Sequence, residues 1–182
     1  MGTESGARIT IWLMMVIGTP PGANVVVYCS GTSQETYAPA LTDAIPLGFT
    51  FVTTTERATT CETDGTGIAG DSSFVSAPNG HPVIPGLSCS TLIRPDSGVT
   101  VYTWNNGHTS TWKWSGKVGP GPTAGELSAT RTGPITAGDY RGYDLSENII
   151  YDNDESTCEA GPLSTNTGDA EWALYPETIS PF

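Results

Sequence analysis

The stretch that decides the fold runs from Val99 to Trp114 and reads V-T-V-Y-T-W-N-N-G-H-T-S-T-W-K-W. Apolar and polar residues alternate on both sides of Asn106-Gly107, and alternation with a period of two is the pattern of a β-strand. An Asn-Gly pair favours the positive φ angles of a tight hairpin turn. The stretch therefore predicts a β-hairpin whose two turn residues are Asn106 and Gly107.

This turn sets a strand register, and the register assigns every side chain to one face of the hairpin. It places Val101 opposite Trp112 and Thr103 opposite Ser110. One face is then expected to join the core and carries Val99, Val101, Trp112 and Trp114. The other face is expected to meet solvent and carries Thr100, Tyr102, Trp104, Thr109, Thr111 and Lys113.

Tyr102, Trp104, Thr109 and Thr111 form a candidate ligand face on the solvent side of this hairpin. Flat exposed rings suit stacking on a sugar, and neighbouring threonine hydroxyls could hydrogen-bond a polysaccharide. An aromatic platform could equally hold a protein partner. The alternative is that a second sheet covers this face, so that both rings belong to the core.

The remaining chain predicts more strands of the same kind. Gly48 to Thr55 places Phe49 and Phe51 on one face and Thr50 and Val52 on the other. No long window shows helical spacing. Further expected strands are Val25 to Tyr28, Glu35 to Ala38, Ser72 to Ser76, Leu87 to Ile93, Glu126 to Arg131, Asn148 to Asp152 and Ala170 to Tyr175.

Short strands separated by Gly, Pro and Asp clusters predict an all-β fold. We expect an antiparallel β-sandwich, with a β-barrel as the alternative. Glu62 to Gly70 and Asp152 to Gly168 are polar and are expected to be exposed loops. The 182 residues fit one domain, expected to span residues 24–182.

The charge balance excludes one class of partner. The chain has 7 basic against 19 acidic residues, a net charge of −12. Such a chain repels a phosphate backbone, so neither nucleic acid nor an anionic membrane surface is an expected partner.

The N-terminal residues suggest export. An apolar run from Ile9 to Gly18 follows Arg8 and precedes the small residues Gly22 and Ala23. The run is too short to span a bilayer as a helix, but it suits the core of a secretory signal over residues 1–23. The alternative is that Ile9 to Ile17 forms a strand or buried helix of the fold.

The cysteines support export independently. Cys29, Cys61, Cys89 and Cys158 are widely separated, and none forms a C-x-x-C pair. This spacing is unlike a zinc knuckle or a thioredoxin-type site and favours two disulfides formed outside the cytoplasm. The sequence leaves all three pairings open. We therefore expect a secreted, disulfide-stabilised protein.

The chain also resembles a known family. The matching motifs are Y-T-W-N-N-G-H-T-S-T at Tyr102 to Thr111 and C-S-G-T-S-Q-E-T-Y-A-P-A-L-T at Cys29 to Thr42, together with Cys61, the L-S-C ending at Cys89, and Cys158. They resemble small secreted all-β proteins of actinobacteria, over roughly Cys29 to Tyr175. The resemblance implies a compact extracellular β-sandwich without a known catalytic centre.

The sequence indicates no catalytic residue and no cofactor. The two histidines, His81 and His108, fall in a loop and at the hairpin turn, and there is no G-x-S-x-G motif. Distant cysteines and two histidines do not form the close ligand pairs of a zinc site. Paired carboxylates for hydrolysis are defined only by their separation in space, so a carboxylate-dependent hydrolase remains an alternative.

The acidic loop Asp152 to Glu155 could bind calcium through carboxylate oxygens. It is not an EF-hand, because Thr157 stands at the glycine position and Leu163 at the closing glutamate position. The alternative is a solvated loop whose charge keeps the protein soluble.

Taken together, the sequence predicts a secreted, non-catalytic β-sandwich that acts in extracellular binding or assembly. Its partner would be an extracellular glycan or a protein. A carbohydrate-binding module for cell-wall or environmental polysaccharide is the alternative, followed by the hydrolase.

Overall fold

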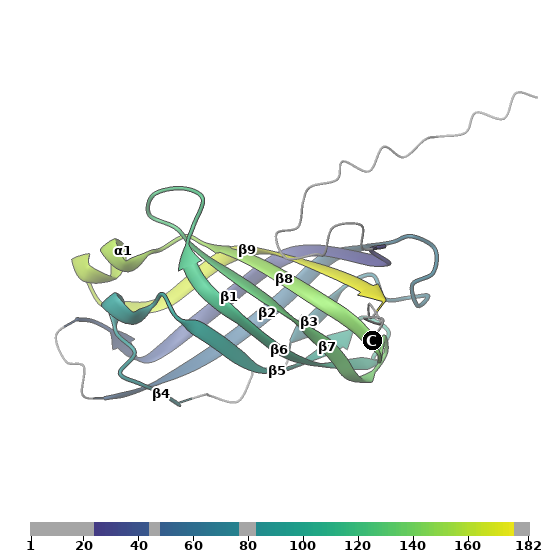
Figure 1. Cartoon of the computed structure of the whole chain (residues 1–182), viewed down its shortest axis with the longest axis horizontal. Coiled ribbons are helices and arrows are strands. Elements are labelled where there is room, and N and C mark those ends of the chain that lie inside the picture. The colour runs from purple at the N-terminus through teal and green to yellow at the C-terminus, as the bar shows by residue number, and fades with distance from the viewer. Residues whose placement is uncertain (1–23, 44–47, 77–82, 177–182) are drawn as a thin grey trace, which may run out of the picture.

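The computed structural model describes residues 24–43, 48–76 and 83–176, which form a barrel of antiparallel strands (Figure 1). The predicted signal segment over residues 1–23 and His81 lie outside the described residues. The described strands are β1 (Val27–Leu41), β2 (Phe49–Thr63), β3 (Phe74–Ser76), β4 (Val83–Pro85), β5 (Pro95–Trp104), β6 (Thr109–Pro120), β7 (Leu127–Gly138), β8 (Tyr143–Tyr151) and β9 (Leu163–Pro176).

The sheet closes on itself because β1 pairs with β9 along one edge and with β2 along the other. From β9 the order runs through β8, β7, β6 and β5, and the short β3 joins β5 to β2. Eight strands form the closed barrel, and β4 adds to β2 outside it. The all-β prediction is confirmed, but the architecture is the barrel that was the alternative. The expected sandwich is not what forms, because one continuous sheet surrounds a single interior.

The two strands predicted at Val25 to Tyr28 and Glu35 to Ala38 are parts of one long strand, β1. The register with β2 shifts between Ser30 and Gly31. At Gly31 the backbone approaches the Arg57 carbonyl so closely that a Cβ atom would collide with it. Glycine therefore lets β1 continue past a bulge instead of ending there.

The central hairpin forms where it was predicted, but its turn is one residue longer. Trp104 N–H donates to the His108 carbonyl and Gly107 N–H donates to the Trp104 carbonyl, each at 2.9 Å. Asn105, Asn106 and Gly107 form the loop, with Gly107 in the left-handed region at a φ of 87°. Consequently Val101 pairs with Thr111 rather than with Trp112.

This difference of one residue reverses part of the face assignment. Tyr102 and Trp104 are only 1% and 3% exposed, whereas Val99 is 52% exposed. The prediction that both rings meet solvent is therefore wrong. Trp112 is buried and Trp114 half-buried, as expected of core residues.

Aromatic rings fill much of the barrel interior. The ring centre of Phe74 lies 4.3 Å from that of Tyr102 and 5.0 Å from that of Trp172. Tyr102 in turn stacks on Trp112 with ring centres 6.1 Å apart. Buried rings in tilted and edge-to-face contact contribute both apolar area and specific geometry to this core.

Two disulfides stabilise the barrel, as predicted. Cys29 of β1 bonds to Cys61, its partner on β2, and Cys89 bonds to Cys158. The second bond joins the 3-10 helix η1 (Cys89–Thr91) to the short helix α1 (Glu155–Ala160). Among the described residues, no helix is long and apolar enough to cross a membrane.

Two local predictions need correction. Leu87 to Ile93 is not a strand, because η1 interrupts it. The expected loop Asp152 to Gly168 contains α1 and the first part of β9. Asp154 starts α1 as its N-cap, and an N-capping Asp followed by Glu155 in the first turn was the available sequence signal.

Candidate functional site

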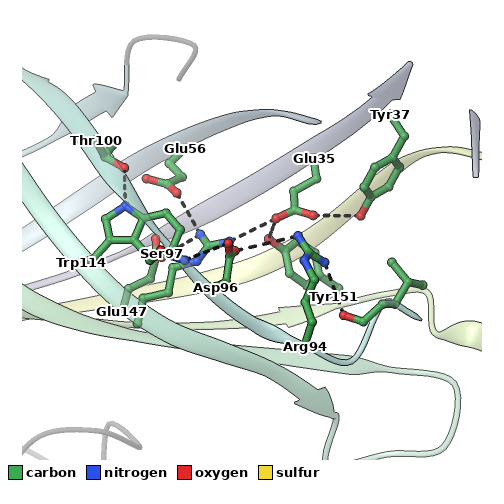
Figure 2. A network of polar contacts seen from close by, with 12 residues as sticks. Glu35, Tyr37, Glu56, Arg94, Asp96, Ser97, Thr100, Trp114, Glu147 and Tyr151 are labelled. Atoms are coloured by element: carbon green, nitrogen blue, oxygen red, sulfur yellow. Dashed lines mark hydrogen bonds and ion pairs between the residues drawn. The ribbon is translucent and has the colours of Figure 1, made fainter. Parts of the chain in front are cut away.

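A cluster of charged side chains occupies the barrel interior around Arg131 of β7 (Figure 2). Arg131 is 2% exposed and forms ion pairs with four carboxylates. Its Nη2 lies 3.1 Å from Glu35 and 3.5 Å from Asp96. Its Nη1 lies 3.3 Å from Glu56 and 3.0 Å from Glu147. We call these five residues the lumen cluster.

The alternation of the strands carries these charges inward. On β1, Ser33, Glu35 and Tyr37 are buried while the residues between them are exposed. Glu56 and Glu147 occupy the corresponding inward positions of β2 and β8. Figure 2 shows the carboxylates approaching from different strands toward one centre. A fixed pleat therefore directs acids from several parts of the chain onto a single arginine.

The Arg131 guanidinium also rests on an aromatic ring. Its Cζ lies 4.6 Å from the ring centre of Trp114, within the range of a cation–π interaction. Trp114 is held in place by a hydrogen bond of 3.0 Å from its Nε1 to Thr100 Oγ1. Burial lowers the pKa of Arg131, but Tyr151 and the carboxylates raise it by more, so the guanidinium stays charged.

The three buried glutamates are satisfied unequally. Besides Arg131, Glu35 accepts from the Tyr151 hydroxyl at 2.9 Å and from the Tyr37 hydroxyl at 2.8 Å. Glu147 accepts from Arg131 and from Trp172 Nε1 at 2.7 Å.

Glu56 has the fewest donors of the three. Arg131 is its side-chain donor, at 3.3 Å, and Glu56 Oε2 is buried with no hydrogen-bond partner. Burial, and then the charge of Glu147, raise the pKa of Glu56 well above its ordinary value, although Arg131 and then the Tyr102 hydroxyl oppose this. Burial likewise raises the pKa of Glu147 against the opposing effect of Arg131.

The cluster becomes less buried toward the start of β5. Asp96, which contacts Arg131, also lies 4.0 Å from Arg94, and both of these side chains are partly exposed. Arg94 further donates to the Leu92 carbonyl at 3.4 Å. A shallow depression of about 280 Å³ lies beside Arg94 on the outer surface. Asp96 thus connects the deeply buried charges to partly exposed ones.

The predicted ligand face is divided between the two sides of the barrel wall. Tyr102 and Trp104 lie in the core, where Trp104 Nε1 donates to Ser110 Oγ at 2.8 Å. Thr109 is exposed and Thr111 half-buried. Because β6 turns these threonines away from the rings, the four residues do not form one surface.

His108 contacts an acid, and the serine nearest to it in the sequence has other partners. Its Nδ1 lies 2.8 Å from Asp139 Oδ2 at the exposed end of the hairpin. The neighbouring Ser110 hydroxyl donates to the Asp139 backbone carbonyl and accepts from Trp104. This serine is therefore committed to structural hydrogen bonds.

The acidic loop has a structural arrangement as well. Asp154 Oδ1 accepts hydrogen bonds from the Ser156 amide and hydroxyl and from the Thr157 amide, which start helix α1. In the part of the chain that the structure describes, no group of three or more His, Cys, Asp or Glu could hold a metal ion.

The outer wall carries an apolar surface near one end of the barrel. Phe49 and Phe51 of β2 are 62% and 46% exposed. They pair with Pro85 and Val83 of β4, and Phe51 also pairs with Ala38 of β1. All five side chains are exposed, and we call them the apolar platform.

The alternating pattern of β2 does not show which of its two faces points outward, so the sequence did not predict the platform. The pattern of Gly48 to Thr55 shows two faces, and the larger phenylalanines would be expected inside. Instead Thr50 and Val52 point inward and are buried. The lumen cluster was missed for a related reason. Each of its acids is a single charged residue within its own strand, and the sequence does not show that these residues meet in space.

Comparison with family models, with curated proteins and with solved structures finds no match for this chain. The geometry of the closed barrel, the lumen cluster and the apolar platform therefore carries the functional argument. The resemblance to small secreted actinobacterial proteins stays a prediction.

Proposed function

We propose that this protein is a secreted, non-catalytic assembly protein that associates with further copies of itself through the apolar platform. The observation that carries the proposal is the pair of exposed phenylalanines, Phe49 and Phe51, beside the exposed Val83. Phenyl and aliphatic groups cannot hydrogen-bond to water, so covering them is favourable. Two disulfides support a location outside the cytoplasm.

Charge favours this face for contact between copies. The chain carries a net charge of −12, so two molecules repel one another over most approaches. The outward positions of β2 from Phe49 to Thr59 carry no acidic residue and include Arg57. Depletion of charge is characteristic of the centre of a protein interface, and here it removes the local repulsion.

A disulfide close to β4 in the chain also helps to fix the position of the platform. β4 leads directly through Gly86 to Ser88 into η1, which the Cys89–Cys158 disulfide ties to α1. β4 and α1 lie toward the same end of the barrel in Figure 1. A rigid surface loses little conformational entropy on association.

The interior acids give less support to a hydrolase. Glu35, Glu56 and Glu147 all point at Arg131, and their side chains are almost completely buried. A glycosidase instead needs two carboxylates on either side of a substrate bond. We therefore place the function on the outer wall.

Sedimentation velocity tests the assembly proposal. We expect the wild-type protein to form oligomers with rising concentration, more strongly at about 0.15 M salt than at low salt because salt screens its acidic charge. Phe51→Ser should remain monomeric at the same concentrations. The matched control is Val99→Ser, which changes an exposed apolar residue of β5. A monomeric wild type, or equal loss in both variants, contradicts the proposal.

A carbohydrate-binding function is the second candidate, favoured by Thr53 and Thr55, which follow Phe51 on the outer face of β2. This places rings and hydroxyls along one strand, the combination that sugar stacking uses. Retention on insoluble cell wall, chitin and cellulose should then fall in Phe51→Ala and not in Val99→Ala. Equal retention of both variants and the wild type contradicts this candidate.

A further inference from the structure

We propose that the barrel lumen is a proton-binding site, in which Glu56 remains a neutral carboxylic acid at neutral pH and its ionisation at higher pH destabilises the barrel. The inference rests on the charge balance and the hydrogen-bond geometry of the lumen cluster. It does not depend on the proposed assembly function.

The charges around Glu56 do not balance if every acid is ionised. The titratable or charged groups that face the cluster are Glu35 and Tyr37 from β1, Asp96 and Tyr102 from β5, Arg131 from β7, Glu147 and Tyr151 from β8, and Arg94 before β5. Arg94 lies beside Asp96, which leaves Arg131 facing three buried glutamates. Uncompensated charge in a buried site is unfavourable, and binding one proton reduces this excess of negative charge by one unit.

The donor pattern selects Glu56 as the acid that keeps the proton. The tyrosine hydroxyls of β1 and β8 add to Arg131 at Glu35, and Trp172 adds to it at Glu147. Hydrogen bonds donated to a carboxylate favour its charged form. Glu56 has one side-chain donor at 3.3 Å, and its second oxygen is buried without a partner. The nearby Tyr102 hydroxyl lowers the pKa of Glu56, but by less than burial and the charge of Glu147 each raise it.

Glu147 strengthens this assignment. Its carboxylate and that of Glu56 contact the same nitrogen, Nη1 of Arg131. Two carboxylates that share one donor repel each other when both are ionised. Protonation of one removes the repulsion, as it does in other paired carboxylates, and Glu56, which accepts fewer hydrogen bonds than Glu147, takes the proton. Burial first, and then Glu147, raise the pKa of Glu56 accordingly.

The effect of pH on stability follows from the direction of this shift. The pKa of Glu56 is higher in the folded barrel than its ordinary value of 4.5, so the folded state binds more protons above that pH. The stabilisation is complete below pH 4.5 and is lost as pH rises through the folded-state value. This pH dependence of stability is opposite to that of a carboxylate held in an ordinary salt bridge, whose contribution is lost as pH falls.

Urea unfolding with the disulfides intact tests the proposal through Glu56→Gln, whose neutral amide imitates the protonated acid. Between about pH 5 and about pH 8.5 the wild-type folding constant should fall by up to about tenfold per pH unit within the titration window. Glu56→Gln should reduce this slope and equal or exceed the wild type at the highest pH. High salt in both samples screens the surface repulsion that acidic residues share.

Glu62→Gln is the matched control, since Glu62 is an exposed acid on the same strand. It should leave the wild-type slope unchanged. A Glu56→Gln slope equal to the wild-type slope, or an equal change in Glu62→Gln, overturns the proposal.

Infrared spectroscopy of the wild type supplies a direct readout that does not depend on stability. At pH 7 the folded protein should show the carbonyl stretch of a protonated carboxyl group, and Glu56→Gln should lack it. Absence of the band in the folded wild type, or its persistence in folded Glu56→Gln, overturns the assignment. If the variant does not fold, the presence or absence of the wild-type band at pH 7 decides whether the lumen holds a proton.

Discussion

The lumen cluster and the apolar platform show opposite polarity on the same strand. Glu56 of β2 is buried in the lumen at 1% exposure, whereas Phe49, earlier on β2, is 62% exposed. A ranking by hydrophobicity would exchange these positions. The comparison shows that the alternation of the pleat assigns a side chain to a face, while the partners from other strands determine whether that face can hold it.

The two regions tolerate their unusual residues for different reasons. In the lumen, Arg131, tyrosine hydroxyls and the Trp172 indole compensate the buried carboxylates. On the platform, water meets apolar groups at a modest cost that a partner molecule could relieve. We therefore expect substitutions in the lumen to change the folding stability, and we propose that substitutions on the platform change association.

Replacing Arg131 should cause the largest loss of stability. Arg131→Met removes the only cation that contacts all three buried glutamates among the described residues and leaves the remaining negative charge of the lumen without a cation at its centre. We expect unfolding by urea to require about 3 to 5 kcal/mol less free energy at pH 7, with part of the loss recovered at lower pH. Arg141→Met, at an exposed position after β7, is the control and should change little. A loss below about 1 kcal/mol would show that the cluster does not need its arginine.

Val52→Thr tests the inward face of β2 and should have an intermediate effect on the free energy of unfolding. Val52 points inward from β2 and is buried. Threonine keeps the shape and the strand propensity but introduces a hydroxyl into the core, which should lower the free energy of unfolding by about 1 to 3 kcal/mol. Chemical denaturation measures this loss. No loss would place residue 52 outside the core.

Phe51→Thr, at the position that precedes Val52 on β2, should have the smallest effect on stability. Its phenyl ring is on the outer wall, so the free energy of unfolding should change by less than about 0.5 kcal/mol. The same denaturation experiment, performed at a concentration where the protein is monomeric, provides the measurement. A loss as large as that of Val52→Thr would reverse the assignment of the two faces.

The sequence predicted much of the local structure, and the failures have specific physical causes. Alternation located the hairpin strands, and the Asn106-Gly107 pair located their turn. The register nevertheless differed by one residue, because the Asn105–Gly107 loop uses positive φ at Gly107 alone. That difference moved Tyr102 and Trp104 from the expected ligand face into the core.

The candidate sites were less accessible to sequence reasoning than the strands. Glu35, Glu56, Arg131 and Glu147 lie far apart in the chain, and each alone resembles a solvated charge. Only the closed barrel brings them around one guanidinium. The apolar platform depends similarly on the pairing of β2 with β4.

The sequence by itself determined the all-β character of the chain, the even number of cysteines and the acidic net charge, because these follow from residue type and local spacing. Only the tertiary structure decided the closure of the sheet, the cysteine pairing, and which side chains face the lumen. Closure requires long-range pairings such as that of β1 with β9, in addition to the pairing of β1 with β2, the strand that follows it directly. No local pattern specifies such pairings, since they arise from the fit of the complete barrel.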